Sequence, residues 1–238
     1  MMWDSQRDVL TQTVDRFVTE LLTGIGIDAP PVDVVTVADR MGIAVIQDAH
    51  QQPRGRQTVV AGRRSIFIRP DERPERTQWA VAHELGETLA HAVFFEAGID
   101  PGEVAPQERE QTANLTASRL LLPALWFPDD AHRLEGNLPD LKPRYATASH
   151  ELIAMRLLDL STPTVITIFD QGRQTRRRGN VPARVPPLDR NEQDCWLEVR
   201  RFRRACERKH DGHRTQGWPI DEAGWQREIL RTTYPDGD

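Results

Sequence analysis

The chain has 238 residues, a net charge of −5, 38% hydrophobic residues and 28% charged residues. This length allows one large domain or two small ones, and no stretch approaches the roughly 18 apolar residues of a membrane-spanning helix. The N-terminus lacks a basic segment leading into an apolar one, which argues against a signal peptide. Only two cysteines occur, Cys195 and Cys206, at a spacing that fits no common zinc signature. We therefore expect a cytoplasmic protein with reduced thiols, with a disulfide between them as a minor alternative.

The charge is distributed unevenly along the chain. Residues 1–170 contain 16 Lys+Arg and 25 Asp+Glu, whereas residues 171–238 contain 15 and 11. A basic C-terminal third could contact nucleic acid or an acidic partner. A solvated, arginine-rich surface is the better interpretation, because aromatic interleaving and a known nucleic-acid motif are both absent. Direct nucleic-acid binding is therefore not expected.

The first part of the chain alternates helical and strand-like patterns. Apolar residues at helical spacing predict a helix over 5–23, and a short helix is expected over 32–41. The β-branched segment 43–48 and a probable hairpin over 58–68 predict a small antiparallel sheet of about three strands. A long helix is expected over about 75–95.

The remaining elements are less regular. A helix is expected over about 107–122, followed by a long exposed connection at 128–144 that holds three prolines. A further helix over 145–159 precedes a β-branched strand at 164–169, and residues 191–210 can form another helix.

These elements predict an α+β fold with three parts. Residues 1–170 form the main domain, and the segment 171–190, rich in Arg, Pro and Gly, is expected to be a linker or surface loop. Residues 191–238 form a C-terminal extension that could pack on the main domain.

The run WAVAHELGETLAH at 79–91 is the stretch whose residue order indicates chemistry. On a helix, His83 and Glu87 lie one turn apart on one side, and His91 follows a further turn along. This is nearly the H-E-x-x-H arrangement, in which two histidines hold zinc and the glutamate activates water, except that Glu87 replaces the second histidine. The triplet HEL alone is weak, since it recurs at 150–152. From the residues alone, a metal site and a polar helix face with a salt-bridged Glu87 are equally well supported.

From about residue 32 to 159 the chain resembles the ImmA/IrrE family of metallo-endopeptidases. The matching segments are VDVVTVADRMGIAVI, IFIRP, ERTQWAVAHELGETLAH and QTANLTASRLLLP. The resemblance implies a reduced zincin-like core, in which the small sheet packs on the active-site helix. It does not cover the residues after about 171.

Carried onto this sequence, the resemblance makes His83 the first metal ligand and Glu84 the general base and acid. His91 matches a family histidine that supports the ligands. The implied activity is metal-dependent hydrolysis of peptide bonds, with zinc as the usual metal. The family's usual substrates are helix-turn-helix transcriptional regulators, so a protein substrate or a bound regulator is the expected partner by analogy.

Two ligand positions depart from the family pattern. The second ligand, normally His, is Glu87, whose harder carboxylate shifts the preference from zinc toward manganese or iron. The third ligand, normally Glu, falls on Thr112 when Asn114 fixes the register, so we assign Thr112 and Asn114 supporting roles. Glu108, one turn before Thr112, is the favoured replacement ligand and Glu110 the alternative. Either could instead be a first-turn residue favoured by the helix dipole.

Two functions remain open for such a site. The first is an active peptidase of the ImmA/IrrE type with a His/Glu metal site. The second is a degenerate, non-catalytic family member, a pseudoenzyme, that binds a regulator or peptide without cutting it. A nucleic-acid-associated regulator that uses the basic C-terminal third ranks below both.

Overall fold

The computed structural model describes residues 2–51, 55–60, 62–182, 184–222 and 224–234. The fold is α+β, as expected, and it divides into two compact units. The first unit comprises residues 1–130 and 143–149, and the second comprises residues 131–142 and 150–238. The division at residue 170 stays a prediction about domains; the compact units divide the chain earlier. None of the described helices is long and apolar enough to cross a membrane.

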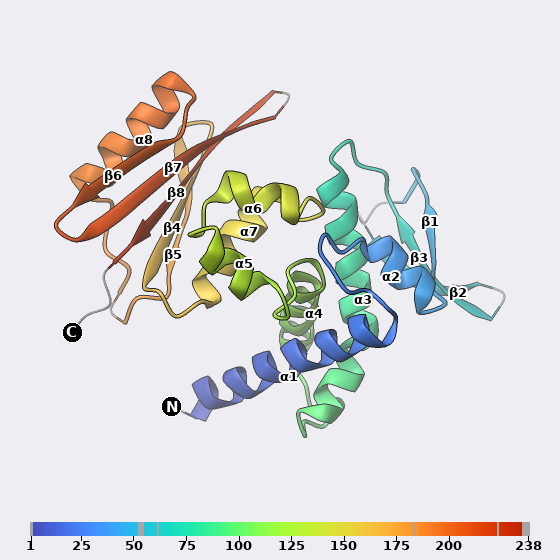
Figure 1. Cartoon of the computed structure of the whole chain (residues 1–238). Helices are drawn as coiled ribbons and strands as arrows, with labels where there is room; N and C mark the ends of the chain where they lie inside the picture. The colour runs from blue at the N-terminus through green and yellow to red at the C-terminus, as the bar shows by residue number, and fades with distance from the viewer. Residues whose placement is uncertain (1, 52–54, 61, 183, 223, 235–238) are drawn as a thin grey trace. The chain divides into compact units, whose positions relative to one another are not determined.

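The first unit opens with two helices and a small sheet (Figure 1). These elements are α1 (Met2–Gly24), α2 (Val34–Arg40), β1 (Ala44–Gln47), β2 (Gly55–Val60) and β3 (Arg63–Ile68). Strand β3 is central, antiparallel to β2 and parallel to β1. The expected all-antiparallel sheet is therefore wrong for β1. Gln47 at the end of β1 and Gly55 at the start of β2 both pair with Ile68, on opposite edges of β3. Strand β2 therefore runs back along the sheet, and the hairpin turns β3 parallel to β1.

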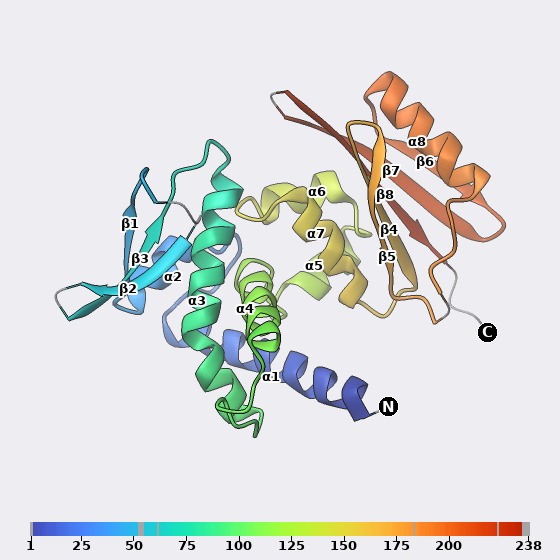
Figure 2. The same ribbon diagram turned by 180° about the vertical axis from the view of Figure 1, so that it is seen from behind.

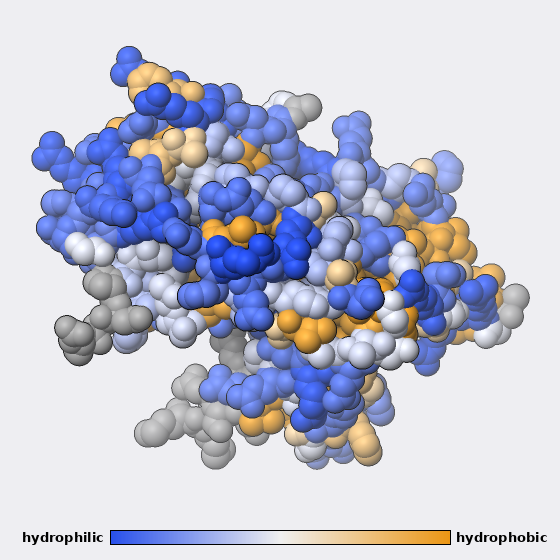
Figure 3. All heavy atoms as spheres, viewed as in Figure 1, coloured by the Kyte–Doolittle hydropathy of each residue, from blue (hydrophilic) through white to orange (hydrophobic). Residues whose placement is uncertain are grey.

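Apolar side chains remain exposed on this small sheet. Hydrophobic residues gather over β1, β2 and β3 on the face seen in Figure 3, whereas most of the remaining visible surface is hydrophilic. Ile46, Val59 and Val60 are the exposed large apolar residues of these strands. A few exposed apolar residues of this kind are common on protein surfaces.

Two long helices follow the small sheet in the first unit, α3 (Pro74–Glu96) and α4 (Pro106–Leu121). Helix α3 begins with Pro74 at its first position and buries one stripe of apolar residues, including Val81 and Leu85. The two helices approach closely at Gly86, where an added Cβ would lie 2.4 Å from the carbonyl oxygen of Ala113. Both helices were expected from their apolar periodicity. The sheet-and-helix arrangement agrees with the expected core, and its zincin-like detail stays a prediction.

The prediction that segment 128–144 is an exposed connection is wrong. The segment contains most of α5 (Phe127–Arg133) and all of α6 (Leu138–Arg144). Two of its three prolines follow the first residue of these helices, where a missing N–H removes no intrahelical hydrogen bond. Leu138 and Leu141 are fully buried. Burial of these apolar residues outweighs the breaker signal that the prolines carry.

The second unit is built on a five-stranded antiparallel sheet, preceded by α7 (His150–Arg156) and a 3-10 turn, η1 (Leu157–Asp159). The sheet order is β5-β4-β8-β7-β6, and α8 covers one face (Figure 2). The elements are β4 (Thr164–Asp170), β5 (Arg173–Gly179), α8 (Arg190–Phe202), β6 (Cys206–His210), β7 (His213–Glu222) and β8 (Trp225–Thr233).

Several expectations change in this unit. The segment 171–190 was expected to be a linker or loop but includes β5, and the helix expected over 191–210 ends at Phe202, where Arg203 adopts a left-handed conformation. Strands β5 and β6 are the two edges of the sheet and are rich in Arg and Lys, residues that protect edges from unwanted pairing. That composition resembles a solvated loop when only the sequence is considered. Cys195 and Cys206 are free and buried, in agreement with the expected reduced thiols.

Asp170, the last residue of β4, links this strand to β5 and β8. Its carboxylate accepts hydrogen bonds from Arg227 Nε at 2.6 Å, Thr175 Oγ1 at 2.7 Å and Trp225 Nε1 at 3.1 Å. Burial raises the pKa of Asp170, but the hydrogen bonds from Arg227 and Thr175 and the charge of Arg227 outweigh burial, so the pKa lies below its ordinary value. The ionised carboxylate therefore stabilises the fold above the ordinary carboxyl pKa, and this stability is lost as the pH falls through the lowered pKa.

Replacing Asp170 with Asn is expected to lower the free energy of unfolding at pH 7 by about 1.5–3 kcal/mol, the range for hydrogen bonds to a charged group. The difference from wild type should shrink as the pH approaches about 3. Urea unfolding at both pH values measures it, with the exposed Asp194→Asn as the control. A cost that does not change with pH would contradict the assigned role of the charge.

Candidate metal centre

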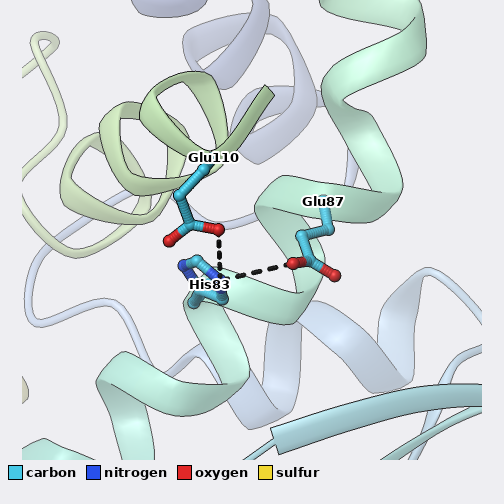
Figure 4. A group of neighbouring side chains, drawn as sticks. All are labelled: His83, Glu87 and Glu110. Atoms are coloured by element: carbon cyan, nitrogen blue, oxygen red, sulfur yellow. Dashed lines mark ion pairs between the residues drawn. The ribbon is translucent and has the colours of Figure 1, made fainter. Parts of the chain in front are cut away.

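Three side chains from α3 and α4 converge on one point (Figure 4). His83 Nε2 lies 3.4 Å from Glu87 Oε1 and 3.7 Å from Glu110 Oε2. One ligand atom from each of these residues lies within 4.8 Å of the other two. His83 and Glu87 meet because they are one helical turn apart, and Glu110 comes from the first half of α4. The expected neighbourhood of His83 and Glu87 is thus present in the structure.

Asn114 orients the imidazole of His83. Asn114 Nδ2 donates to Glu110 Oε1 at 2.9 Å, so Asn114 Oδ1 is left as an acceptor, 3.2 Å from His83 Nδ1. This assignment places the proton on Nδ1 and a free lone pair on Nε2, the nitrogen that faces both carboxylates. Histidines that bind metals are commonly held in one tautomer by such a hydrogen bond.

The donor set fits a divalent cation. Bonds of about 2.0–2.2 Å at tetrahedral angles place ligand atoms about 3.3–3.6 Å apart, close to the separations around His83 Nε2. The side chain of His83 is 20% exposed, and those of Glu87 and Glu110 are 49% and 55% exposed, so a cation could enter from solvent. One imidazole with two carboxylates suits zinc, manganese and iron.

Glu84 lies beside these residues and is buried, with 6% of its surface exposed. Burial raises the pKa of its carboxyl group, and the nearby carboxylate of Glu87 raises it further. A hydrogen bond from the backbone N–H of Gln57 acts in the opposite direction without reversing the shift. A carboxyl group beside a metal site can accept a proton from water and return it to a leaving group.

The structure does not bring Glu108 into this group. Its carboxylate accepts a hydrogen bond from the backbone N–H of Ala105 at 3.2 Å, at the start of α4. The hydroxyl of Thr112 is buried and donates to the backbone carbonyl of Glu108 at 2.9 Å. His91 is exposed and lies outside the group. The metal-binding role of Glu108 and the supporting roles of His91 and Thr112 stay predictions.

Glu110 was only the alternative ligand at the sequence level. Glu108 was favoured because it lies one turn before Thr112, but Thr112 is buried in the protein core. Asn114 instead contacts His83, and Glu110 lies one turn before Asn114 on the same face of α4. The same helical spacing counted from Asn114 leads to Glu110.

A helix carrying a His-Glu pair, faced by a second helix and bordered by a small sheet, defines a metallopeptidase-like fold. The model of the Peptidase M78 family, described as an IrrE N-terminal-like domain, matches residues 38–158, just over half of the chain. The chain belongs to this family, which confirms the resemblance to ImmA/IrrE proteins.

A solved structure shows the same fold over a larger part of the chain. A Mycobacterium tuberculosis transcriptional regulator is similar with a TM-score of 0.66 and 15% sequence identity, and the match covers 98% of this chain and 81% of that chain. At this identity the likeness concerns the fold alone. No curated protein shows a significant sequence match.

Proposed function

We propose that the protein is a metal-dependent peptidase that hydrolyses peptide bonds, with Glu84 as general base. His83, Glu87 and Glu110 would hold the divalent cation. The observation that carries the proposal is the convergence of their three ligand atoms within 4.8 Å, beside a buried carboxyl group of raised pKa. Membership of the Peptidase M78 family supports the same assignment.

The bound cation, Glu84 and Asn114 have separate roles in the proposed reaction. A bound divalent cation supplies polarisation of the scissile carbonyl and a more acidic water. Glu84 accepts the proton of the attacking water and delivers it to the leaving amine, a dual role that suits its raised pKa. Asn114 keeps the Nδ1–H of His83 engaged, so that Nε2 remains available for the cation.

The family favours zinc, whereas the two carboxylates favour manganese or iron more than a second histidine would. We propose a transcriptional regulator as the protein substrate or bound partner. The family resemblance supports this choice, and the structurally similar mycobacterial protein is itself a transcriptional regulator.

A non-catalytic, regulator-binding protein is the second candidate. It is favoured by Thr112, which occupies the position of a family glutamate ligand and whose hydroxyl is bonded within its own helix. Metal-loaded protein that binds a regulator and shows no Glu84-dependent hydrolysis would select this candidate.

A pair of matched variants tests the ligand set. Glu110→Gln is expected to weaken zinc or manganese binding at least tenfold, because it removes a charged ligand. Glu108→Gln should leave the affinity unchanged, because that carboxylate is bonded to the N-terminus of α4. Elemental analysis and calorimetric titration with each metal measure the effect, with about one equivalent expected for wild type. A selective loss in Glu108→Gln would instead make Glu108 the ligand, and wild-type protein that takes up no divalent metal would contradict the proposed site.

A further inference from the structure

Gly55, the first residue of β2, lies directly against the carboxylate of Glu84. A Cβ added at Gly55 would be 2.4 Å from Glu84 Oε1, 2.8 Å from its Cγ and 2.9 Å from its Cδ. Real Cβ atoms essentially never make contacts this short. The backbone of Gly55 does not adopt a positive φ, so glycine is not required there by conformation. The requirement is for space, and the group that occupies the space is the side chain of the proposed general base.

Strand β2 contacts the same face of α3 at a second position. The backbone N–H of Gln57 donates to the Glu84 carboxylate. The Thr88 hydroxyl donates to Gln57 Oε1 at 2.9 Å. Gly55 and Gln57 share one face of the strand, and Glu84 and Thr88 share one face of the helix. Two matched contacts therefore set how the strand lies along the helix. A shift of β2 would break the contact with Thr88 as well as the one with Glu84.

We propose that Gly55 is a positioning residue for the proposed reaction: its missing side chain lets β2 seat the Glu84 carboxylate on the Gln57 N–H. The inference rests on the proposed catalytic role of Glu84. A side chain at residue 55 would force the carboxylate off this seat, away from the position from which it transfers protons. Displacements of about 1 Å in a catalytic group can cost about a hundredfold in rate.

A double-mutant cycle tests the contact without requiring activity. Gly55→Ala alone should lower the melting temperature by about 4 °C or more, because the added methyl group overpacks the site. In a Glu84→Ala background the same substitution should cause no loss, because the carboxylate has been removed. Gly24→Ala serves as the control, since a Cβ there meets nothing within 4 Å. An equal loss from Gly55→Ala in both backgrounds would overturn the proposal.

Kinetics test the consequence for catalysis. With fluorescently labelled casein as the probe, assayed well below the melting temperature, Gly55→Ala should lower kcat about a hundredfold. KM and metal content should remain at the wild-type values, which a general loss of structure would not produce. An unchanged kcat in an active enzyme would overturn the proposal. Metal-loaded wild-type protein without any hydrolysis would count against the proposed function, whereas the stability cycle would still decide whether Gly55 seats Glu84.

Discussion

Replacing Glu84 with Gln is expected to abolish peptide hydrolysis while the metal stays bound. Glutamine has nearly the same shape and can still accept the hydrogen bond from the Gln57 N–H, but it cannot take a proton from water. General acid–base groups contribute about 10²–10⁴-fold to rates, so the loss of activity should fall in this range. His83, Glu87 and Glu110 are untouched, so metal content should not change.

The raised pKa of Glu84 implies that the activity lost in Glu84→Gln does not result from unfolding. Because burial raises the pKa, the neutral carboxyl group is favoured in the folded protein, and the benefit is lost as the pH rises through the raised value. An uncharged glutamine avoids the cost of burying a negative charge, so Glu84→Gln should be at least as stable as wild type once the pH exceeds the raised pKa of Glu84. Lost activity then reports on chemistry.

Hydrolysis of labelled casein and elemental analysis of the same samples measure the outcome. Glu108→Gln is the matched control and should retain activity, since its carboxylate lies outside the metal group. Full activity in Glu84→Gln would remove Glu84 from the mechanism. Metal-loaded wild-type protein without hydrolysis would favour the non-catalytic candidate.

The parts of the site that could be predicted from the sequence are those set by local geometry. His83, Glu84 and Glu87 lie within five residues of one helix, so the helical period alone places them together. Helix α3 was predicted for the same reason, because its buried stripe repeats every turn. The position of Glu110 beside His83 depends on how α4 crosses α3. The helical period of either segment does not predict this crossing.

The wrong predictions for β1 and β5 have the same physical origin. The parallel pairing of β1 with β3 depends on which edge of β3 each neighbour occupies, and the sequence pattern of a short strand does not carry this information. Strand β5 resembles a loop because an edge strand tolerates many arginines. In both cases the tertiary partner decides the structure.

The crossing of α3 and α4 makes Gly86→Ala the substitution expected to damage fold and site together. A Cβ at Gly86 would lie 2.4 Å from Ala113 O and 3.0 Å from both its C and Cα atoms. All three are backbone atoms and cannot rotate away, so the helices must separate. Overpacking costs up to about 3 kcal/mol and the better helix propensity of alanine returns about 1 kcal/mol, so the free energy of unfolding should fall by about 2 kcal/mol.

The same separation should weaken metal binding. Asn114 follows Ala113 directly and contacts His83, and Glu110 lies one turn before Asn114, so both move with α4. We expect at least a tenfold loss of zinc or manganese affinity, comparable to the loss of a residue that orients a ligand. Urea unfolding and calorimetric titration measure the two effects, with Gly24→Ala as the control that should change neither. A destabilised Gly86→Ala protein with wild-type metal affinity would show that the cation does not bridge α3 and α4. The affinity for a bridging cation would have to fall when the two helices separate.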